Sequence, residues 1–453
     1  MADSTAEFGA LLRRRRLKAG LTIEGLAETS GISARGIGKL ERGERTVPQR
    51  RTMAALADGL GLEARARDEF LAATRVARAA RVRGAEGDGP AEREGGSADF
   101  VGRAAEMARL TALADEASDR NVGAGPDTRA ALVVAVSGAP GTGKTTLALQ
   151  TLRETADRFP GGRLMVDLRG MDAEPLEPPE VMLRVLKRLG VTDKDLARSG
   201  PQGHPELYRA VLAERRCLLV LDNARDEAQV RPLLPGTGAG MTLITSRRML
   251  TGLENVHRLR LGVLSVGESA ELLSGLVGVE RAGVEPGAVA EVAERCGYLP
   301  LALRVAGNWL VTRSGWSVRR LADRLGVEER RLGVLSAGDV RVSAAFDLSY
   351  RQLTPEAGCL FRLLALVDGP DVGVECAAAL AGWEVVDAED VLEELVEVGL
   401  LVGSGSGRYS CHDLLRLFAR ERLRGEVSVG EVEAARVGLR RWLLETVVVA
   451  GRW

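Results

Sequence analysis

The sequence has few cysteines, histidines and aromatic residues, and it contains no long apolar run. Five cysteines are scattered over 453 residues without any CxxC spacing, and three histidines are too few for most metal clusters. The first residues, MADSTAEFG, lack the basic and apolar regions of a signal peptide, and no apolar run approaches the roughly 18 residues that span a bilayer. These absences predict reduced thiols and a soluble, cytoplasmic protein with no membrane partner.

Small and branched apolar residues are abundant. Hydrophobic residues make up 45% of the chain and aromatic residues only 4%, so the cores must be built from Leu, Val and Ala. A chain of 453 residues predicts about three domains. Residues 1–83 contain 17 basic and 10 acidic side chains, whereas the whole chain has a net charge of -1. This asymmetry predicts that the N-terminal part meets a polyanion, which charge alone does not identify as DNA, RNA or a membrane.

Residues 21–43, LTIEGLAETSGISARGIGKLERG, contain two short helical patterns joined by a turn. Thr22 and Ser33 stand at the expected N-cap positions, and Gly31 supplies the permissive turn residue. A buried seam between the helices is expected from apolar residues of both patterns: Leu26, Ala27, Ile32, Ile37 and Leu40. The stretch therefore predicts a helix-turn-helix.

The second helix of this motif carries the predicted DNA contacts. Arg35, Lys39 and Arg42 share the outer face that a recognition helix lays into the major groove. Arg35 and Lys39 are predicted to approach base edges, and Arg42 to meet phosphates. With FGALLRRRRLKAGLT before it and LERGER after it, the motif resembles the Xre/Cro-type helix-turn-helix family, which implies a double-stranded DNA partner. The predicted DNA-binding residues are Ala34, Arg35, Lys39 and Arg42; a helical protein-binding module is the alternative.

After the helix-turn-helix, the pattern of apolar residues along the chain changes twice. Residues 83–97 are rich in Gly and charge and predict a flexible linker. From residue 100 to about 258, short apolar runs such as ALVVAV and CLLVL alternate with helical patterns, which predicts a doubly wound parallel sheet. Helical periodicity then takes over, and between about 344 and 423 three helical patterns precede two candidate strands joined by a Gly/Ser turn. That order predicts a winged helix.

Residues 138–145, GAPGTGKT, match the P-loop pattern GxxxxGK followed by Ser or Thr, between an apolar strand and a helical pattern. Gly141 and Gly143 allow backbone amides to curl around phosphates, and Lys144 places a charge near the β and γ oxygens. Thr145 offers its hydroxyl to Mg²⁺. A chance Gly-rich turn is the alternative. The predicted nucleotide-binding residues of the loop are Gly138, Gly141, Thr142, Gly143, Lys144, Thr145 and Thr146.

Two more polar residues follow predicted strands of the same sheet. Asp222 ends the second apolar strand at the carboxyl edge, where ligands bind, and is the candidate Walker B acid. Arg247 follows a third strand and is predicted to sense a γ-phosphate, with an exposed salt-bridging arginine as the alternative. Asp222 and Arg247 are therefore the predicted catalytic residues, and Thr145 and Asp222 the predicted Mg²⁺ ligands.

Seven stretches resemble, in order, the NB-ARC group of STAND NTPases. They are FVGR (100–103), the P-loop, VDLRG (166–170), LLVLDNARD (218–226), TLITSRR (242–248), CGYLPLAL (296–303) and CHDLLRLFARE (411–421). The resemblance implies binding of ATP or ADP, with Val101 and Arg103 near adenine and ribose, Pro300 against the base, and His412 at the β-phosphate. Without it, Pro300 would be read as a helix starter and His412 as a surface residue.

The chain departs from the eukaryotic pattern of this group at Asn223, which stands where a second acid follows Asp222. An asparagine cannot accept a proton from an attacking water as a carboxylate can. Hydrolysis is therefore expected to be slow, or to need Asp226 or another group. A switch fits this sequence better than a motor.

The predicted fold is multidomain, with an all-α helix-turn-helix head, an α/β P-loop NTPase domain, a helical domain and a winged helix. The predicted boundaries are 1–82 for the head, 83–97 for the linker, 98–260 for the nucleotide-binding domain, 261–335 for the helical domain, 336–424 for the winged helix and 425–453 for a C-terminal helical segment. That last segment is compatible with a truncated sensor, a homo-oligomer helix or a packing helix. The predicted function is a transcription regulator gated by ADP/ATP exchange. A STAND signalling scaffold, or an ATPase with an N-terminal adaptor, is the alternative.

Overall fold

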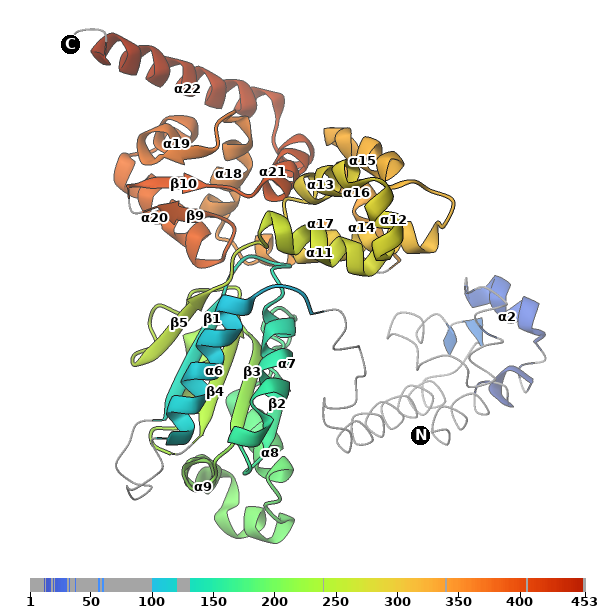
Figure 1. Ribbon diagram of the computed structural model, residues 1–453, viewed down its shortest axis with the longest axis vertical. Helices are drawn as coiled ribbons and strands as arrows, with labels where there is room; N and C mark the ends of the chain where they lie inside the picture. The colour runs from blue at the N-terminus through green and yellow to red at the C-terminus, as the bar shows by residue number, and fades with distance from the viewer. Residues whose placement is uncertain are drawn as a thin grey trace. The chain divides into compact units, whose positions relative to one another are not determined.

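The computed structural model describes residues 100–119 and 131–450, apart from positions 239, 339 and 405, together with some positions between residues 12 and 60. The chain divides into two compact units, Met1–Glu94 and Gly95–Trp453 (Figure 1). None of the helices in these described ranges has the length and apolar character that a membrane span requires.

The first unit contains helix α2 (Ile23–Ser30). Its start is as predicted, because the Thr22 Oγ1 atom accepts a hydrogen bond of 3.0 Å from the Gly25 amide. Leu26 and Ile37 of the predicted seam are fully buried, and the described part of the small core also includes Leu12, Leu56, Ala57 and Leu60. The predicted DNA-binding residues Ala34, Arg35, Lys39 and Arg42 lie outside the described residues.

The second unit begins with a parallel sheet of five strands in the order β2-β3-β4-β1-β5. The strands are β1 (Leu132–Ser137), β2 (Arg163–Asp167), β3 (Leu218–Ala224), β4 (Met241–Ser246) and β5 (Val256–Arg260), and all their pairings are parallel. β1 and β4 are buried at every position, as expected for parallel strands covered on both faces. The predicted parallel sheet is confirmed.

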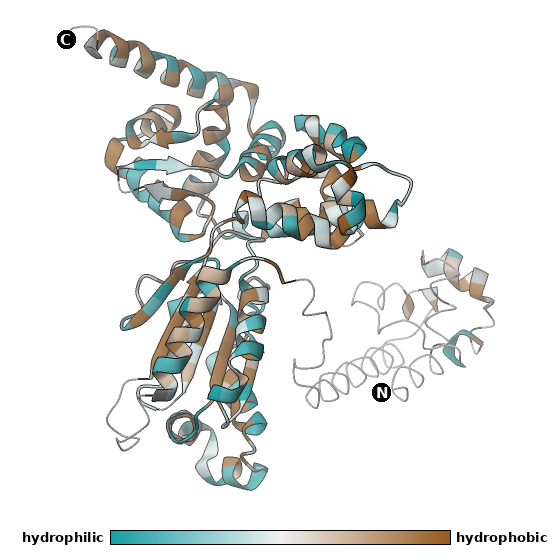
Figure 2. Ribbon diagram, viewed as in Figure 1, coloured by the Kyte–Doolittle hydropathy of each residue, from teal (hydrophilic) through white to brown (hydrophobic). Residues whose placement is uncertain are grey.

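Helices cover both faces of this sheet and create two separate cores. Helices α6 (Ala104–Asp119) and α7 (Lys144–Glu154) pack on one face, and α8 (Pro178–Arg188) and α9 (Asp193–Glu214) pack on the other. Successive side chains of β3 point to opposite faces, so that Leu219 belongs to one core and Val220 to the other. Figure 2 shows the apolar strands, in brown, enclosed by these helices.

The chain after β5 is mainly helical. Its helices are α11 (Val266–Val277), α12 (Val279–Val284), α13 (Pro286–Arg295), α14 (Pro300–Thr312), α15 (Val318–Gly326), α16 (Glu328–Val334), α17 (Val342–Tyr350), α18 (Pro355–Leu363), α19 (Val374–Ala381), α20 (Val385–Glu397), α21 (Asp413–Glu426) and α22 (Val429–Ala450). One hydrophobic cluster runs through them from Leu264 to Ala435. The helices on either side of residue 335 therefore share a core.

A small antiparallel sheet lies among the later helices, with strand order β8-β10-β9. Its strands are β8 (Asp371–Gly373), β9 (Val402–Ser404) and β10 (Arg408–Ser410). The β9–β10 hairpin is formed at the predicted Gly/Ser turn. A shorter pair, β6 (Ser336–Ala337) with β7 (Val340–Arg341), precedes α17.

Candidate nucleotide-binding site

The P-loop lies between the end of β1 and the start of α7, at the carboxyl edge of the sheet. Gly141 and Gly143 have φ values of 83° and 93°, which glycine adopts without strain. A Cβ atom on Gly141 would lie 2.9 Å from the Leu301 Cβ atom, so the close approach of α14 also requires glycine here. The loop therefore has the glycines that the predicted phosphate cradle needs.

The Lys144 ammonium folds back onto its own loop. Its Nζ atom donates to the carbonyl oxygens of Gly138 at 2.7 Å and Ala139 at 2.9 Å. Burial and, next, the positive charge of Arg247 together lower the pKa of Lys144 to about 7, although the negative charge of Asp222 partly opposes them. An anion between Lys144 and Arg247 would relieve this repulsion.

Thr145 and Asp222 come together at the tips of α7 and β3. The Thr145 hydroxyl donates to both carboxylate oxygens of Asp222, at 3.0 and 3.1 Å, and the Thr245 hydroxyl donates to Oδ1 at 2.5 Å. Burial raises the pKa of Asp222, and these hydroxyl bonds oppose that rise. A hydroxyl and a carboxylate are hard oxygen ligands, so Thr145 and Asp222 fit the predicted Mg²⁺ site.

Arg247 leaves the end of β4 and reaches α17. Its Nη1 atom donates to the Ala345 carbonyl oxygen at 2.7 Å and to the Ser349 hydroxyl at 2.8 Å. Burial lowers the pKa of Arg247 to about 10. The guanidinium is half-buried between the sheet and α17. This differs from the exposed salt-bridging arginine that was the alternative.

Arg103 is buried at the base of the same site, and its φ of 64° is unusual for a residue other than glycine. Its guanidinium donates to the carbonyl oxygens of Gly262 at 2.5 Å and Thr142 at 3.3 Å. Arg103 thereby connects the start of α6 with the P-loop and with the segment after β5. Val101 is half-buried against the helical cluster.

Pro300 is the first residue of α14, so the proline does start a helix. The next residue contacts the P-loop directly, because the Leu301 amide donates to the Gly141 carbonyl oxygen at 3.2 Å. The CGYLPLAL stretch therefore lies against the phosphate-binding loop although the two are far apart in sequence. The structure brings both together with Arg103, Asp222 and Arg247.

Comparison with known proteins agrees with this geometry. A model described as "Helix-turn-helix domain" matches residues 7–70, and one described as "NB-ARC domain" matches residues 121–282. The chain contains a helix-turn-helix domain and an NB-ARC domain. Three curated relatives share a large part of the chain.

The chain is 43% identical over 331 residues to the regulatory protein AfsR of Streptomyces coelicolor, over 73% of this chain and 33% of that protein. It is 45% identical over 288 residues to the regulatory protein AfsR of Streptomyces griseus, over 64% of this chain and 30% of that protein. The disease resistance-like protein DSC1 of Arabidopsis thaliana is 26% identical over 305 residues, which cover 64% of this chain and 23% of that protein. The chain thus spans about a third of the length of the two regulatory proteins.

His412 caps α21 and contacts the stretch that lies on the P-loop of the NB-ARC domain. Its Nδ1 atom accepts the Leu414 amide at 3.2 Å, so Nε2 carries the proton and donates to the Gly297 carbonyl oxygen at 2.8 Å. A Cβ atom on Gly297 would lie 2.4 Å from the His412 Cε1 atom. Both ring nitrogens are bound to protein groups, so a contact with a β-phosphate stays a prediction and requires Nε2 to leave Gly297.

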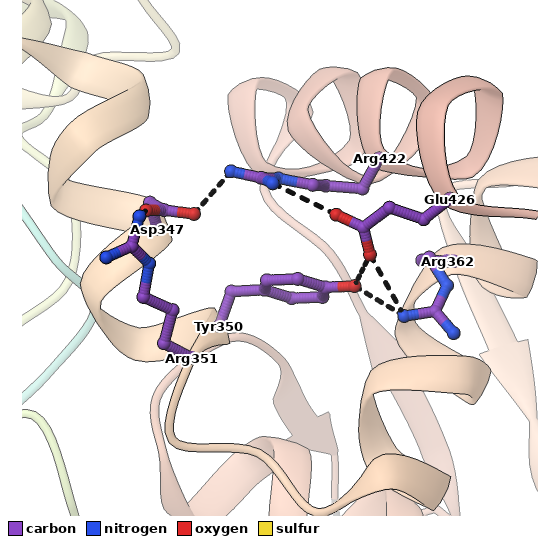
Figure 3. Close-up of polar contacts among 6 residues, drawn as sticks. All are labelled: Asp347, Tyr350, Arg351, Arg362, Arg422 and Glu426. Carbon is purple, nitrogen blue, oxygen red and sulfur yellow. Dashed lines mark hydrogen bonds and ion pairs between the residues drawn. The ribbon is translucent and has the colours of Figure 1, made fainter.

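A polar cluster that the sequence analysis did not identify ties α17 and α18 to α21 (Figure 3). The Tyr350 hydroxyl donates to the Glu426 Oε2 atom at 2.6 Å, and Arg422 bonds both Glu426, at 3.0 Å, and Asp347. Two i,i+4 spacings within this cluster are visible in the sequence, that of Arg422 with Glu426 and that of Asp347 with Arg351. The helix that binds Arg247 is thereby connected to the helix that His412 caps.

Proposed function

We propose that the protein is a DNA-binding transcription regulator in which exchange of ADP for ATP in the NB-ARC domain controls the helix-turn-helix. The observation that carries this proposal is the pair of hydrogen bonds from Arg247 to α17. A γ-phosphate, which only ATP has, would compete with Ala345 and Ser349 for the same guanidinium. Charge-assisted bonds from arginine to phosphate are stronger than bonds to neutral oxygens, so ATP would favour release of α17.

The residues of the site have distinct proposed roles. The backbone of the P-loop and Lys144 would hold the phosphates, and Thr145 and Asp222 would hold Mg²⁺, which neutralises phosphate charge when bound. Val101 and Arg103 would lie near adenine and ribose, Pro300 would pack on the base, and His412 would reach the β-phosphate. The support for these roles is that Arg103, the start of α14 and Asp222 all lie around one P-loop.

The DNA-binding part of the proposal rests on the first unit. Its support is the helix-turn-helix match, the basic excess of residues 1–83 and the regulatory proteins among the relatives. Arg35 and Lys39 would contact base edges, next to Ala34, and Arg42 would contact a phosphate. The proposed boundaries are those of the sequence analysis, including a winged helix at 336–424.

The test is selection of duplexes from a random pool by the full chain, followed by affinity measurements with Mg²⁺ and either ATP or ADP. We expect at least a tenfold difference between the two nucleotides, because gating requires differential affinity for two states. The variant Lys144→Ala should lose this difference, whereas Arg35→Ala with Lys39→Ala should lose DNA affinity and keep nucleotide affinity. Equal affinity with both nucleotides contradicts gating, and the absence of any selected duplex supports the adaptor alternative.

A further inference from the structure

The VDLRG stretch (166–170) is one of the seven stretches that resemble the NB-ARC group. Its aspartate, Asp167, is the last residue of β2. β2 is the immediate neighbour of β3, and the parallel register pairs Asp167 with Asp222. Parallel strands end at one edge of a sheet, so a second carboxylate stands beside the Walker B acid.

The backbone on both sides fixes this arrangement. The Leu168 amide donates to the Asp222 carbonyl oxygen at 2.8 Å, and the Gly170 amide donates to the Asn223 carbonyl oxygen at 2.8 Å. A Cβ atom on Gly170 would lie 2.5 Å from that Asn223 oxygen, so only glycine permits the close approach. The segment that follows β2 therefore runs along the end of β3 and holds Asp167 beside Asp222.

Protein groups orient the Asp167 carboxylate through one of its two oxygen atoms. Its Oδ1 atom accepts the Arg169 amide at 2.8 Å and the Asn223 side-chain amide at 3.4 Å. Within the part of the chain that the structure describes, no donor is bonded to Oδ2, and the side chain is exposed.

Asp226, which the sequence suggested as a group for hydrolysis, has a structural role as a helix cap. Its Oδ1 atom accepts the Gln229 amide at 2.9 Å and caps the short helix α10 (Glu227–Val230). Asn223, which replaces the second acid, donates to Asp167 instead. The acid that is absent after Asp222 is thus present on the adjacent strand.

We propose that Asp167 orients the water that hydrolyses the γ-phosphate of a nucleoside triphosphate, an inference that rests on the nucleotide binding proposed above. The water oxygen bonds to the γ-phosphorus as the bond from that phosphorus to the β–γ bridging oxygen breaks. The water proton passes to the Asp167 carboxylate and then to solvent. The products are a nucleoside diphosphate and inorganic phosphate, so hydrolysis returns the switch to its diphosphate form.

The experiment uses the full chain and compares Asp167→Asn with Asp226→Asn. Asparagine keeps an acceptor for the Arg169 amide at position 167, and it remains a good N-cap at position 226. Single-turnover hydrolysis of γ-labelled ATP, nucleotide affinity by calorimetry and the ratio of bound ATP to ADP are measured for each. We expect Asp167→Asn to hydrolyse about 100-fold more slowly with its ATP affinity changed less than threefold, and to retain ATP.

The control Asp226→Asn should hydrolyse at the wild-type rate. If thermal denaturation shows that Asp167→Asn is unfolded, Asp167→Ser removes the carboxylate and keeps a turn-forming acceptor, with the same loss expected. Wild-type hydrolysis by the folded variant, or loss of hydrolysis in Asp226→Asn alone, overturns the role of Asp167. A wild-type protein that binds ATP without hydrolysing it also overturns this role and leaves gating intact, whereas failure to bind any nucleotide overturns the proposed function itself.

Discussion

The Nε2 atom of His412 lies 2.8 Å from the carbonyl oxygen of Gly297, a residue 115 positions earlier in the chain. Gly297 directly precedes the Tyr298–Leu299 turn into α14, and the first turn of α14 contacts the P-loop through Leu301. The hydrogen bond therefore joins the start of α21 to the segment that rests on the phosphate-binding loop. A phosphate that accepted a hydrogen bond from Nε2 would have to replace the Gly297 carbonyl oxygen.

Replacing His412 by alanine should loosen this contact. His412→Ala removes the bond to Gly297 and the cap on the Leu414 amide, which together stabilise the protein by about 1–3 kcal/mol. We expect a lower unfolding temperature with ADP bound and at least tenfold faster release of a fluorescent ADP. The control His412→Asn keeps a capping side chain but is too short to reach Gly297. Wild-type ADP release by His412→Ala would show that His412 does not hold the bound ADP.

Stability should depend on pH through the same histidine. Burial lowers the pKa of His412, and the Gly297 bond and the charge of Asp413 only partly oppose this. The unfolded chain, with a histidine pKa of about 6.5, takes up the proton first, so stability is lost as pH falls below that value. Denaturant unfolding of wild type and His412→Asn between pH 5.5 and 8 checks this. The difference between them should narrow toward low pH, and a constant difference would contradict the prediction.

Removing the P-loop lysine should remove most nucleotide affinity. Among the residues that the structure describes, Lys144 donates only to carbonyl oxygens of its own loop, so its ammonium group is available to phosphate oxygens. A charge-assisted bond contributes about 1.5–3 kcal/mol, which predicts at least a tenfold loss in Lys144→Ala. Calorimetry with ATP and with ADP measures the loss. Unchanged affinity for both nucleotides would show that the loop does not bind phosphate as proposed.

The Asp222 carboxylate should matter chiefly when Mg²⁺ is present. The Thr145 and Thr245 hydroxyl groups both donate hydrogen bonds to this carboxylate. These hydroxyl groups must reorient when a cation binds to the carboxylate. Asp222→Ala should therefore weaken ATP binding with Mg²⁺ by at least tenfold and change binding in chelator much less. Titrations with and without Mg²⁺ separate the two cases. If Mg²⁺ has no effect on the wild type, neither Thr145 nor Asp222 is a metal ligand.

Weakening the contact between Arg247 and α17 should favour ATP over ADP. Ser349→Ala removes one of the two acceptors of the Arg247 guanidinium and leaves Ala345 in place. We expect the ratio of ATP to ADP affinity to rise several-fold, because less energy is needed to free the arginine. Ser343→Ala, on the same helix, is the matched control and should leave the ratio unchanged. An unchanged ratio in Ser349→Ala would remove the basis for gating by Arg247.

Much of the nucleotide site could be predicted from the sequence because it depends on local spacing. An apolar strand followed by GAPGTGKT places the P-loop at a sheet edge, and a second apolar strand delivers Asp222 to the same edge. The predicted N-cap at Thr22 is equally local and is found in the structure. In each case the residues that act together are close in the sequence, or they follow parallel strands, whose carboxyl ends lie at the same edge of the sheet.

Only the tertiary structure decided which distant residues meet. The strand order β2-β3-β4-β1-β5 makes Asp167 the neighbour of Asp222, although 218–222 lies far along the chain from β2. Helix packing brings α17 to Arg247 and Gly297 to His412. Apolar periodicity specifies that a strand or helix has a buried face, but not which other segment covers it. Packing between segments that lie far apart in the sequence therefore determines the partners of Asp167, Arg247 and His412. The local sequence around each residue does not specify those partners.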